Sequence, residues 1–188
     1  QLGMSAVVQG LQFRLILESP NQSAIVMAHE TEAADLVFER PRTFRDSTRP
    51  MYPFKYSSRQ EIVFEEPWRS CIRVKVATQK GKGRAGTYRL LHLSEVAHWL
   101  QAARNFSALI GGFADRPGSW IIIESTANGV GGEFHDRYWR AVAGQKKAAE
   151  AGRAYSDYRA IFLPWTIDPQ YRIPGATRAD FPVDDPEI

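Results

Sequence analysis

The stretch Tyr88-Arg-Leu-Leu-His-Leu-Ser-Glu-Val-Ala-His-Trp99 decides the fold that we expect for this chain. Leucines at positions 90, 91 and 93 form a short apolar run, typical of a strand buried on both faces of a sheet. Ser94 and Glu95 follow the run directly. In open α/β sheets the ligand crevice lies at the carboxyl ends of the strands, so this carboxylate is placed for chemistry. An acid at this point can also simply charge the start of the next helix.

The length and composition fit one ordinary globular domain, or a fragment of a longer chain. The 188 residues are 44% hydrophobic and 24% charged, which allows a full core and excludes a disordered chain. The formal net charge of +3 permits contact with nucleic acid but does not argue for it. Cys71 is the only cysteine, which excludes a disulfide framework and fits a reducing compartment. We expect neither a membrane span nor a signal peptide, and the absence of an initiator Met favours a fragment.

The first five residues, Gln1-Leu-Gly-Met-Ser5, lead directly into an expected helix over residues 6–17. A glycine and a hydroxyl at a helix start suit a phosphate-binding loop, because the backbone can approach phosphates and a serine can ligate Mg²⁺. The usual loop ends in Gly-Lys-Ser/Thr, and Met4 stands in the place of the lysine. Gly-x-Ser before a helix is also a common N-cap, and this stretch alone favours that interpretation.

Apolar runs and helical periodicities alternate along the rest of the chain, which predicts an α/β fold with a mostly parallel sheet. Pro41 should end the second helix, and residues 42–59 should form a surface loop with its aromatics against the core. Residues 61–64 and 70–78 should pair around a turn as a hairpin insertion. The other expected strands are 23–28, 120–124 and 158–163. The expected helices are 6–17, 32–40, 96–106 and 133–147. The apolar stripe of the first helix is Val7, Val8, Leu11, Leu15 and Ile16, and the last helix should place Phe134, Tyr138, Trp139 and Val142 in the core.

The glycine-rich stretch 79–87 lies just before the central strand. Gly81 and Gly86 have the spacing of a second phosphate loop, but no lysine follows Gly86, so we reject that interpretation. The stretch is either a solvated linker or a loop that presents Arg84 to a phosphate, in its own or a neighbouring subunit. The sequence alone favours the linker.

A second apolar strand, residues 120–124, also ends in small polar side chains. Thr126 and Asn128 follow it and could contact a γ-phosphate or hold an attacking water, or they could merely form a turn. Serine-hydrolase chemistry has no support, because no Gly-x-Ser-x-Gly elbow is present. No Cys or acid stands at metal-ligand spacing from a histidine, so we expect no metal site at His29, His92, His98 or His135.

Taken together, these stretches resemble the ATPase domain of the large terminase subunit, the DNA-packaging motor of tailed bacteriophages. The resemblance covers nearly the whole chain in the right order, and its most specific part is the stretch Glu124-Ser-Thr-Ala-Asn-Gly129. The other stretches that carry it are Gln1-Leu-Gly-Met-Ser5, Leu91-His-Leu-Ser-Glu-Val-Ala-His-Trp99, Gly132-Glu-Phe134 with Trp139, and Phe162-Leu-Pro-Trp165 with Pro169-Gln-Tyr171.

The resemblance implies ATP and Mg²⁺ as ligands and gives the site residues their roles. Glu95 would be the Walker B carboxylate that polarises the water attacking the γ-phosphate. Ser94 stands where many Walker B motifs carry the Mg²⁺-side aspartate, and would bind a water of the metal shell without supplying charge. Thr126 would belong to the motif that couples hydrolysis to movement, and Arg84 would be a trans-acting arginine finger. The expected nucleotide-binding residues are Gln1, Gly3, Met4, Ser5, Ser94 and Asn128, with Ser5 near Mg²⁺.

The resemblance also implies a P-loop fold of the ASCE type, with the strand before the phosphate loop lying outside this chain. Residues 1–165 would form the ATPase domain, and residues 166–188 would begin a linker toward a nuclease domain. The parent protein would move double-stranded DNA into a prohead in the host cytoplasm. It would contact the DNA backbone non-specifically and assemble as a ring with the portal protein and the small terminase subunit. There are two rival interpretations. The first is a helicase-like motor, but this sequence contains none of the further helicase motifs that it would need. The second is a non-hydrolysing scaffold remnant, which Met4 and Ser94 suggest.

Overall fold

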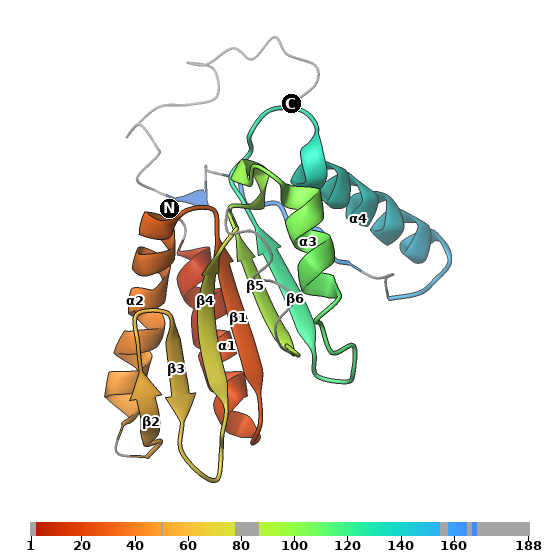
Figure 1. The fold of residues 1–188 in the computed structure, drawn as a ribbon. Coiled ribbons are helices and arrows are strands. Elements are labelled where there is room, and N and C mark those ends of the chain that lie inside the picture. Colours follow the sequence, from red (N-terminus) through yellow and green to blue (C-terminus); the bar gives the residue numbers. More distant parts are fainter. Residues whose placement is uncertain (1–2, 50, 78–86, 155–157, 165–166, 169–188) are drawn as a thin grey trace, which may run out of the picture.

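A six-stranded sheet with helices on both faces forms the body of the molecule (Figure 1). The computed structural model describes residues 3–49, 51–77, 87–154, 158–164 and 167–168. The strand order is β2-β3-β4-β1-β5-β6. The elements are α1 (Met4–Glu18), β1 (Ser23–Ala28), α2 (Thr31–Thr48), β2 (Phe54–Ser57), β3 (Glu61–Phe64), β4 (Cys71–Val76), β5 (Leu90–Ser94), the 3₁₀ helix η1 (Val96–His98), α3 (Ala102–Ile110), β6 (Trp120–Glu124) and α4 (Gly132–Glu150).

The sheet is mixed, with a parallel part that carries the candidate site. Strands β4, β1, β5 and β6 run parallel to one another, whereas β2, β3 and β4 form an antiparallel meander. The expected α/β fold with a mostly parallel sheet is therefore confirmed, and so is the predicted pairing of the two strands around residues 65–69. The strand β2 adds a third member to that hairpin.

Successive side chains of the parallel strands point to opposite faces of the sheet and pack into two separate hydrophobic cores, one on each face. On one face, Ala24 and Val26 pack with Phe13 of α1 and Phe38 of α2. On the other face, Leu91 and Leu93 pack with residues of η1 and α3. The strand β5 is buried along its whole length, as expected from its apolar sequence. None of the helices in the described ranges is both long and apolar enough to cross a lipid bilayer.

The helix α2 does not stop at Pro41 but continues to Thr48, so the expected loop over residues 42–59 is wrong in its first part. Phe38 is buried before the proline and Phe44 packs against the same core after it. Full burial of Phe38, about 1.5–3 kcal/mol, and partial burial of Phe44 together offset the roughly 3 kcal/mol cost of an internal proline. The later part of that stretch contains β2, and its Phe54 packs against the core as expected.

The expected helix over residues 96–106 is interrupted. Trp99 is extended, with φ −76° and ψ 125°, and its buried indole N–H donates to the carbonyl of Ser94 at 3.0 Å. This contact holds the chain after β5 in a turn, so that only η1 forms before α3 starts at Ala102. Packing of one large side chain thus overrides local helix propensity.

Two expected strands differ from the structure in burial or in existence. The strand β6 is only half-buried along its length, because it lies at the edge of the sheet within the described residues. Residues 158–163 form no strand, and Ile161 and Phe162 are exposed. An apolar sequence alone therefore did not make a strand.

Two of the expected helices bury a different set of side chains than predicted. In α1, Val8 and Ile16 are buried as expected, but Val7 and Leu11 face solvent. The buried face of α1 also carries Gln9 and Gln12. Gln12 is accommodated there because its amide donates to the carbonyls of Ile25 and Leu90 at 3.0 and 3.2 Å. Trp139 of α4 is mostly exposed rather than in the core, because α4 packs against η1 and α3 and leaves its opposite side uncovered.

Candidate functional site

The candidate site lies at the carboxyl edge of the parallel strands, where the start of α1 meets the ends of β5 and β6. Ser94 and Glu124 are the last residues of these two strands, and they are register partners in the parallel ladder. Ser5, in the first turn of α1, donates a hydrogen bond from Oγ to Glu124 Oε1 at 2.5 Å. Residues that are 119 positions apart in the chain therefore meet at this edge.

The helix α1 begins without a side-chain cap on its first backbone N–H groups. Gly3 is its N-cap and has φ 68°, a left-handed conformation that glycine adopts without steric cost. Its carbonyl accepts hydrogen bonds from the backbone N–H groups of Ala6 and Val7. Ser5 is thus inside the helix and makes no cap, so the N-cap interpretation of this serine is wrong. Met4 is exposed on the outside of the first turn.

Glu124 is the centre of a polar cluster between α1 and the sheet. Its Oε1 atom receives the Ser5 hydroxyl and lies 2.8 Å from Nε2 of His92, which is completely buried. The Ser94 hydroxyl belongs to the register partner of Glu124 and also acts on this carboxylate. Burial acts to raise the pKa of Glu124, but the hydrogen bond and charge of His92, with the hydroxyls of Ser5 and Ser94, lower it below its ordinary value. The carboxylate is therefore ionised at neutral pH.

The geometry also fixes how His92 serves this cluster. An imidazole that carries its proton on Nε2 donates to the Glu124 carboxylate, as the 2.8 Å separation requires. The other ring nitrogen, Nδ1, is buried and has no partner among the described residues. His92 therefore fixes the orientation of Oε1 by the contact from Nε2.

Glu95 comes directly after β5 and has an unusual backbone. Its φ of 56° and ψ of 44° place it in the left-handed region, which costs a residue other than glycine about 1–2 kcal/mol. Such strain gathers at functional sites, where the surrounding structure imposes it. Here it turns the Glu95 side chain out of the line of the strand and toward the loop that follows β6.

The loop after β6 holds the Glu95 carboxylate by three hydrogen bonds. Oε2 of Glu95 accepts from Ser125 Oγ at 3.2 Å, from the Thr126 backbone N–H at 3.0 Å and from Thr126 Oγ1 at 3.0 Å. His98 Nε2 lies 3.1 Å from Thr126 Oγ1, so the hydroxyl that donates to Glu95 can accept from His98. These contacts give the carboxylate one defined orientation at the edge of the sheet.

A second pair of contacts joins this loop to η1. Asn128 donates from Nδ2 to the carbonyl of Ala97 at 3.1 Å, and the Ala97 backbone N–H donates to Ser125 Oγ at 3.1 Å. The strand ends of β5 and β6 are therefore clamped together beyond the sheet itself. Asn128 makes a contact within the protein in this structure, and its predicted contact with a phosphate stays a prediction.

The structure brings most of the expected site residues to one edge. Ser5, Ser94, Glu95 and Thr126 all lie there, linked through Glu124 or through the loop after β6. Gln1 and Arg84 lie outside the described residues, as do residues 165–166 and 169–188.

Sequence reasoning missed His92 and Glu124. The signal that could have found them is the period of two in the strands. It puts His92 and Ser94 on one face of β5, and Glu124 lies opposite Ser94 in register.

The donor set at this edge suits a hard cation that keeps most of its water. One ionised carboxylate and two hydroxyls face one another, and no group of three or more His, Cys, Asp or Glu that could hold a metal occurs in the part of the chain that the structure describes. Mg²⁺ is usually bound by one or two carboxylates, substrate phosphates and several waters, so Ser5, Ser94 and Glu124 fit it. They do not fit a zinc site, which takes four nitrogen or sulfur ligands in the main.

Comparison with known proteins adds no family to these observations. The sequence matches no protein-family model, and no curated protein gives a significant match.

Proposed function

We propose that this chain is the ATPase domain of a phage terminase large subunit, built on a P-loop fold. In this proposal the parent protein hydrolyses ATP and uses the energy to move double-stranded DNA into a prohead. The ordered resemblance of the sequence motifs supports the proposal. The geometry of the site supports one part of it, namely that the chain binds and hydrolyses a nucleotide.

The observation that carries the proposal is the contact of Ser5 with Glu124. It puts the amino end of a 15-residue helix beside the carboxyl ends of two parallel strands, one of which is followed by Glu95. Helix N-termini bind phosphates through their free N–H groups and the positive end of the helix dipole. A phosphate site and a fixed carboxylate at one sheet edge are the two parts that nucleotide hydrolysis needs.

Glu95 has the role of the residue that orients the attacking water. Phosphoryl transfer needs positioning and charge stabilisation rather than a covalent nucleophile. A water that donates a hydrogen bond to Glu95 attacks the γ-phosphorus, and the bond from that phosphorus to the bridging oxygen of ADP breaks. The proton of the water passes to the Glu95 carboxylate and then to solvent or to the released phosphate.

Thr126 and Ser125 have a positioning role in this scheme. They hold Oε2 of Glu95 by three hydrogen bonds and belong to the loop that directly follows β6. A movement of that loop on loss of the γ-phosphate would turn the Glu95 carboxylate. A rotation of the Glu95 carboxylate would likewise move the loop. This supports the role of Thr126 in coupling hydrolysis to movement.

Mg²⁺ would supply charge neutralisation for the phosphates of ATP when it is bound. Ser5 would hold it from the helix start, with the hydroxyl of Ser94 on the strand side. Arg84 keeps the finger role that the resemblance implies.

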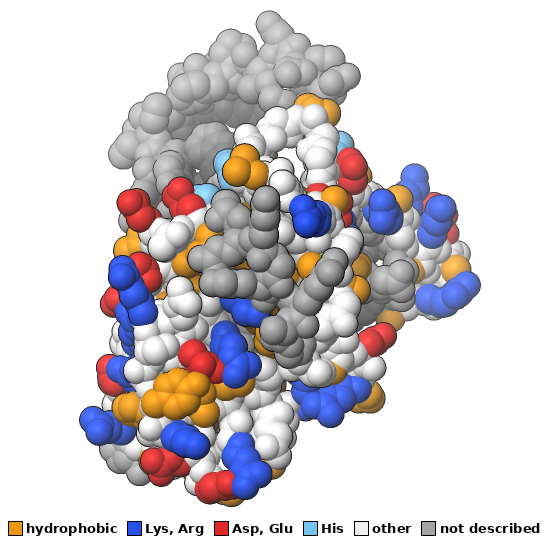
Figure 2. Space-filling view, viewed as in Figure 1, with side chains coloured by type: hydrophobic (Ala, Val, Ile, Leu, Met, Phe, Trp, Pro, Cys, Tyr) orange, Lys and Arg blue, Asp and Glu red, His pale blue; other side chains and the backbone are white. Residues whose placement is uncertain are grey.

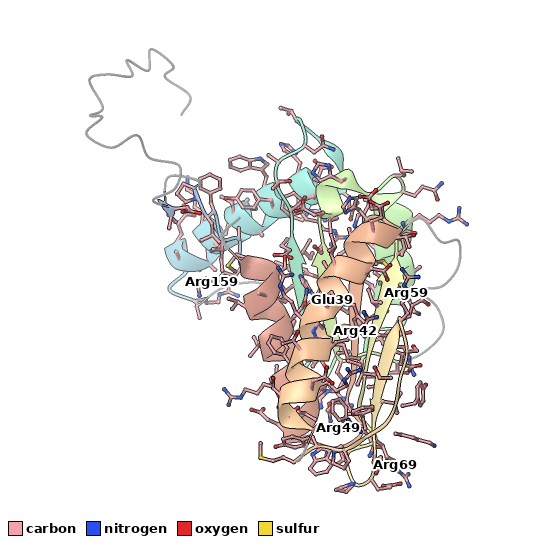
Figure 3. The ribbon with its side chains drawn as sticks, turned by 90° about the vertical axis from the view of Figure 1, so that its left-hand side faces the viewer. Glu39, Arg42, Arg49, Arg59, Arg69 and Arg159 are labelled. Atoms are coloured by element: carbon pink, nitrogen blue, oxygen red, sulfur yellow. The ribbon has the colours of Figure 1, made fainter. Side chains whose placement is uncertain are left out.

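The proposed DNA contact does not come from the face of α2 and the β2–β3 hairpin. Basic and acidic side chains are interspersed over the lower part of the surface in Figure 2, and Figure 3 shows Arg42 and Glu39 together on α2. Most arginines of this face are paired with carboxylates, so they offer little net charge to phosphates. The pairs are Arg42–Glu39, Arg45–Asp46, Arg59–Asp35 and Arg69–Glu66. The proposal includes the partners that the resemblance implies. The chain would act in the host cytoplasm on double-stranded DNA, in a ring of copies that contacts the portal protein and the small terminase subunit.

ATP hydrolysis by the full-length gene product, with and without double-stranded DNA, tests the proposal. We expect turnover that DNA stimulates and that falls by about 10²–10⁴-fold in Glu95→Gln, because glutamine keeps the shape but cannot accept the proton of the water. Glu18→Gln is a suitable control, because Glu18 is an exposed carboxylate that pairs with Arg14 at the opposite end of α1. No turnover in the wild type would favour the scaffold interpretation. DNA-stimulated turnover that survives in Glu95→Gln would remove Glu95 from the mechanism.

A further inference from the structure

Glu124 stands in the place of a carboxylate that the end of β5 lacks. Ser94 is the residue of β5 at which a metal-facing acid would be expected, and it has no charge. Glu124 is its register partner on the neighbouring strand β6. Side chains of register partners in a parallel pair point to the same face of the sheet. The carboxylate of Glu124 therefore projects beside the Ser94 hydroxyl, toward the start of α1.

The contacts of Glu124 are those of a carboxylate that faces a metal site. Its Oε1 atom accepts from Ser5 Oγ at 2.5 Å, and Ser5 is the hydroxyl expected near Mg²⁺. His92 fixes the same oxygen from behind at 2.8 Å and is completely buried. Metal-facing carboxylates are commonly held by second hydrogen bonds of this kind, which orient them and maintain their charge. The side chain of Glu124 keeps 20% of its surface exposed, so it remains reachable from the crevice.

We propose that Glu124 supplies, from β6, the carboxylate that holds the water shell of the nucleotide-bound Mg²⁺, and that Ser94 is tolerated because of it. This inference rests on the proposed nucleotide-binding function. It assigns the metal-facing carboxylate to β6, whereas Glu95 follows the neighbouring strand β5. It also gives His92 the role of a positioning residue that acts through Glu124.

Metal-dependent nucleotide binding tests the inference without any need for turnover. The affinity of the full-length protein for a non-hydrolysable ATP analogue is measured with Mg²⁺ and with EDTA. We expect the wild type to bind more tightly with Mg²⁺. In Glu124→Gln this gain should shrink by about 10–100-fold, while the affinity in EDTA stays unchanged. Adding Ser94→Asp to Glu124→Gln should restore the gain, because it returns a carboxylate to the same pair of residues.

Glu61→Gln is the matched control. The Glu61 side chain has the same 20% exposure and is also ion-paired, to Arg73 at 2.5 Å, but it lies on β3, which is separated from β5 by β4 and β1. It should leave the metal-dependent gain unchanged. A structural role for Glu124 predicts a different result, namely that Glu124→Gln weakens binding equally in Mg²⁺ and in EDTA. That outcome would overturn the inference.

A second measurement uses the wild type and so does not depend on the folding of a variant. The imidazole resonances of His92 should shift when Mg²⁺ and the analogue are added together, and should not shift with the analogue in EDTA. Unchanged resonances in the presence of bound analogue and Mg²⁺ would also overturn the inference. If the analogue does not bind under either condition, the proposed function itself is wrong, and the inference falls with it.

Discussion

Ser94 and Glu124 end adjacent parallel strands as register partners, and the carboxylate of Glu124 accepts hydrogen bonds from Ser5 of α1 and from His92. A hydroxyl on one strand and an acid on the next thus form a single polar unit at the edge of the sheet. The carboxylate that would be expected at the end of β5 is thus found at the end of β6, and β5 supplies a hydroxyl.

The first prediction concerns the pH dependence of stability. The pKa of Glu124 in the folded protein lies below its ordinary value of 4.5, because the contacts of His92, Ser5 and Ser94 outweigh the effect of burial. The folded state therefore binds this proton less readily than the unfolded chain, so the ionised carboxylate stabilises the fold above the unfolded pKa. This contribution is lost as the pH falls through the folded pKa.

Urea unfolding of the wild type and of Glu124→Gln between pH 7 and pH 3 measures this contribution. The difference in the free energy of unfolding should be constant above about pH 5.5 and should shrink below pH 4.5. A difference that grows as the pH falls would mean that the folded pKa is raised, contrary to the contacts seen here.

The second prediction concerns the left-handed backbone at Glu95, with φ 56°. Glu95→Ala and Glu95→Gly both remove the carboxylate and its hydrogen bonds, but only glycine relieves the strain. The relief is about 1–2 kcal/mol, and the larger entropy of the unfolded glycine chain offsets about 0.5–1 kcal/mol of it. Glu95→Gly should therefore be more stable than Glu95→Ala by about 0.5–1 kcal/mol in thermal or urea unfolding. At the exposed helical position Ala103, glycine should instead be less stable than alanine by about 1 kcal/mol.

The third prediction concerns the Thr126 hydroxyl, which donates to Glu95 at 3.0 Å. Thr126→Val keeps the shape and the backbone N–H but removes this hydrogen bond to a charged group, which is worth about 1.5–3 kcal/mol. If Glu95 orients the attacking water, kcat should fall about tenfold or more, while Thr126→Ser should keep most of the activity. Equal kcat values for the valine and serine variants would show that the hydroxyl does not position Glu95.

The fourth prediction concerns the core strand. Leu91 of β5 is fully buried, whereas Leu100 is 87% exposed in the segment after η1. Leu91→Ala should lower the free energy of unfolding by about 2–5 kcal/mol, because it opens a cavity between the sheet and α3. Leu100→Ala should change it by less than about 0.5 kcal/mol. Similar losses in both variants would contradict the central position of β5.

The positions at which sequence reasoning succeeded share a strong local signal. The apolar run at positions 90–93 predicted a fully buried strand, and β5 is buried along its length. Residues 61–64 and 70–78 were predicted to pair around a turn, and β3 and β4 do pair there. In both cases the pattern of side chains that carries the prediction lies within a few neighbouring residues.

The positions at which it failed depend on contacts between distant parts of the chain. Pro41 does not end α2, because Phe38 before it is buried and Phe44 after it packs, half-buried, against the same core. The helix expected from residue 96 is broken at Trp99, whose side chain is buried in a core with Ile25 of β1 and donates its indole N–H to the Ser94 carbonyl. Residues 158–163 have an apolar sequence but form no strand, and Ile161 and Phe162 are exposed.

The sequence by itself determined the alternation of helices and strands, the central buried strand, and the small polar residues at the strand ends. These are local properties, because side-chain periodicity and turn chemistry act over a few residues. Only the tertiary structure decided that Ser5, His92 and Glu124 share one cluster. The register of β5 with β6 and the packing of α1 on the sheet bring them together, and both are set by the burial of side chains far apart in the chain.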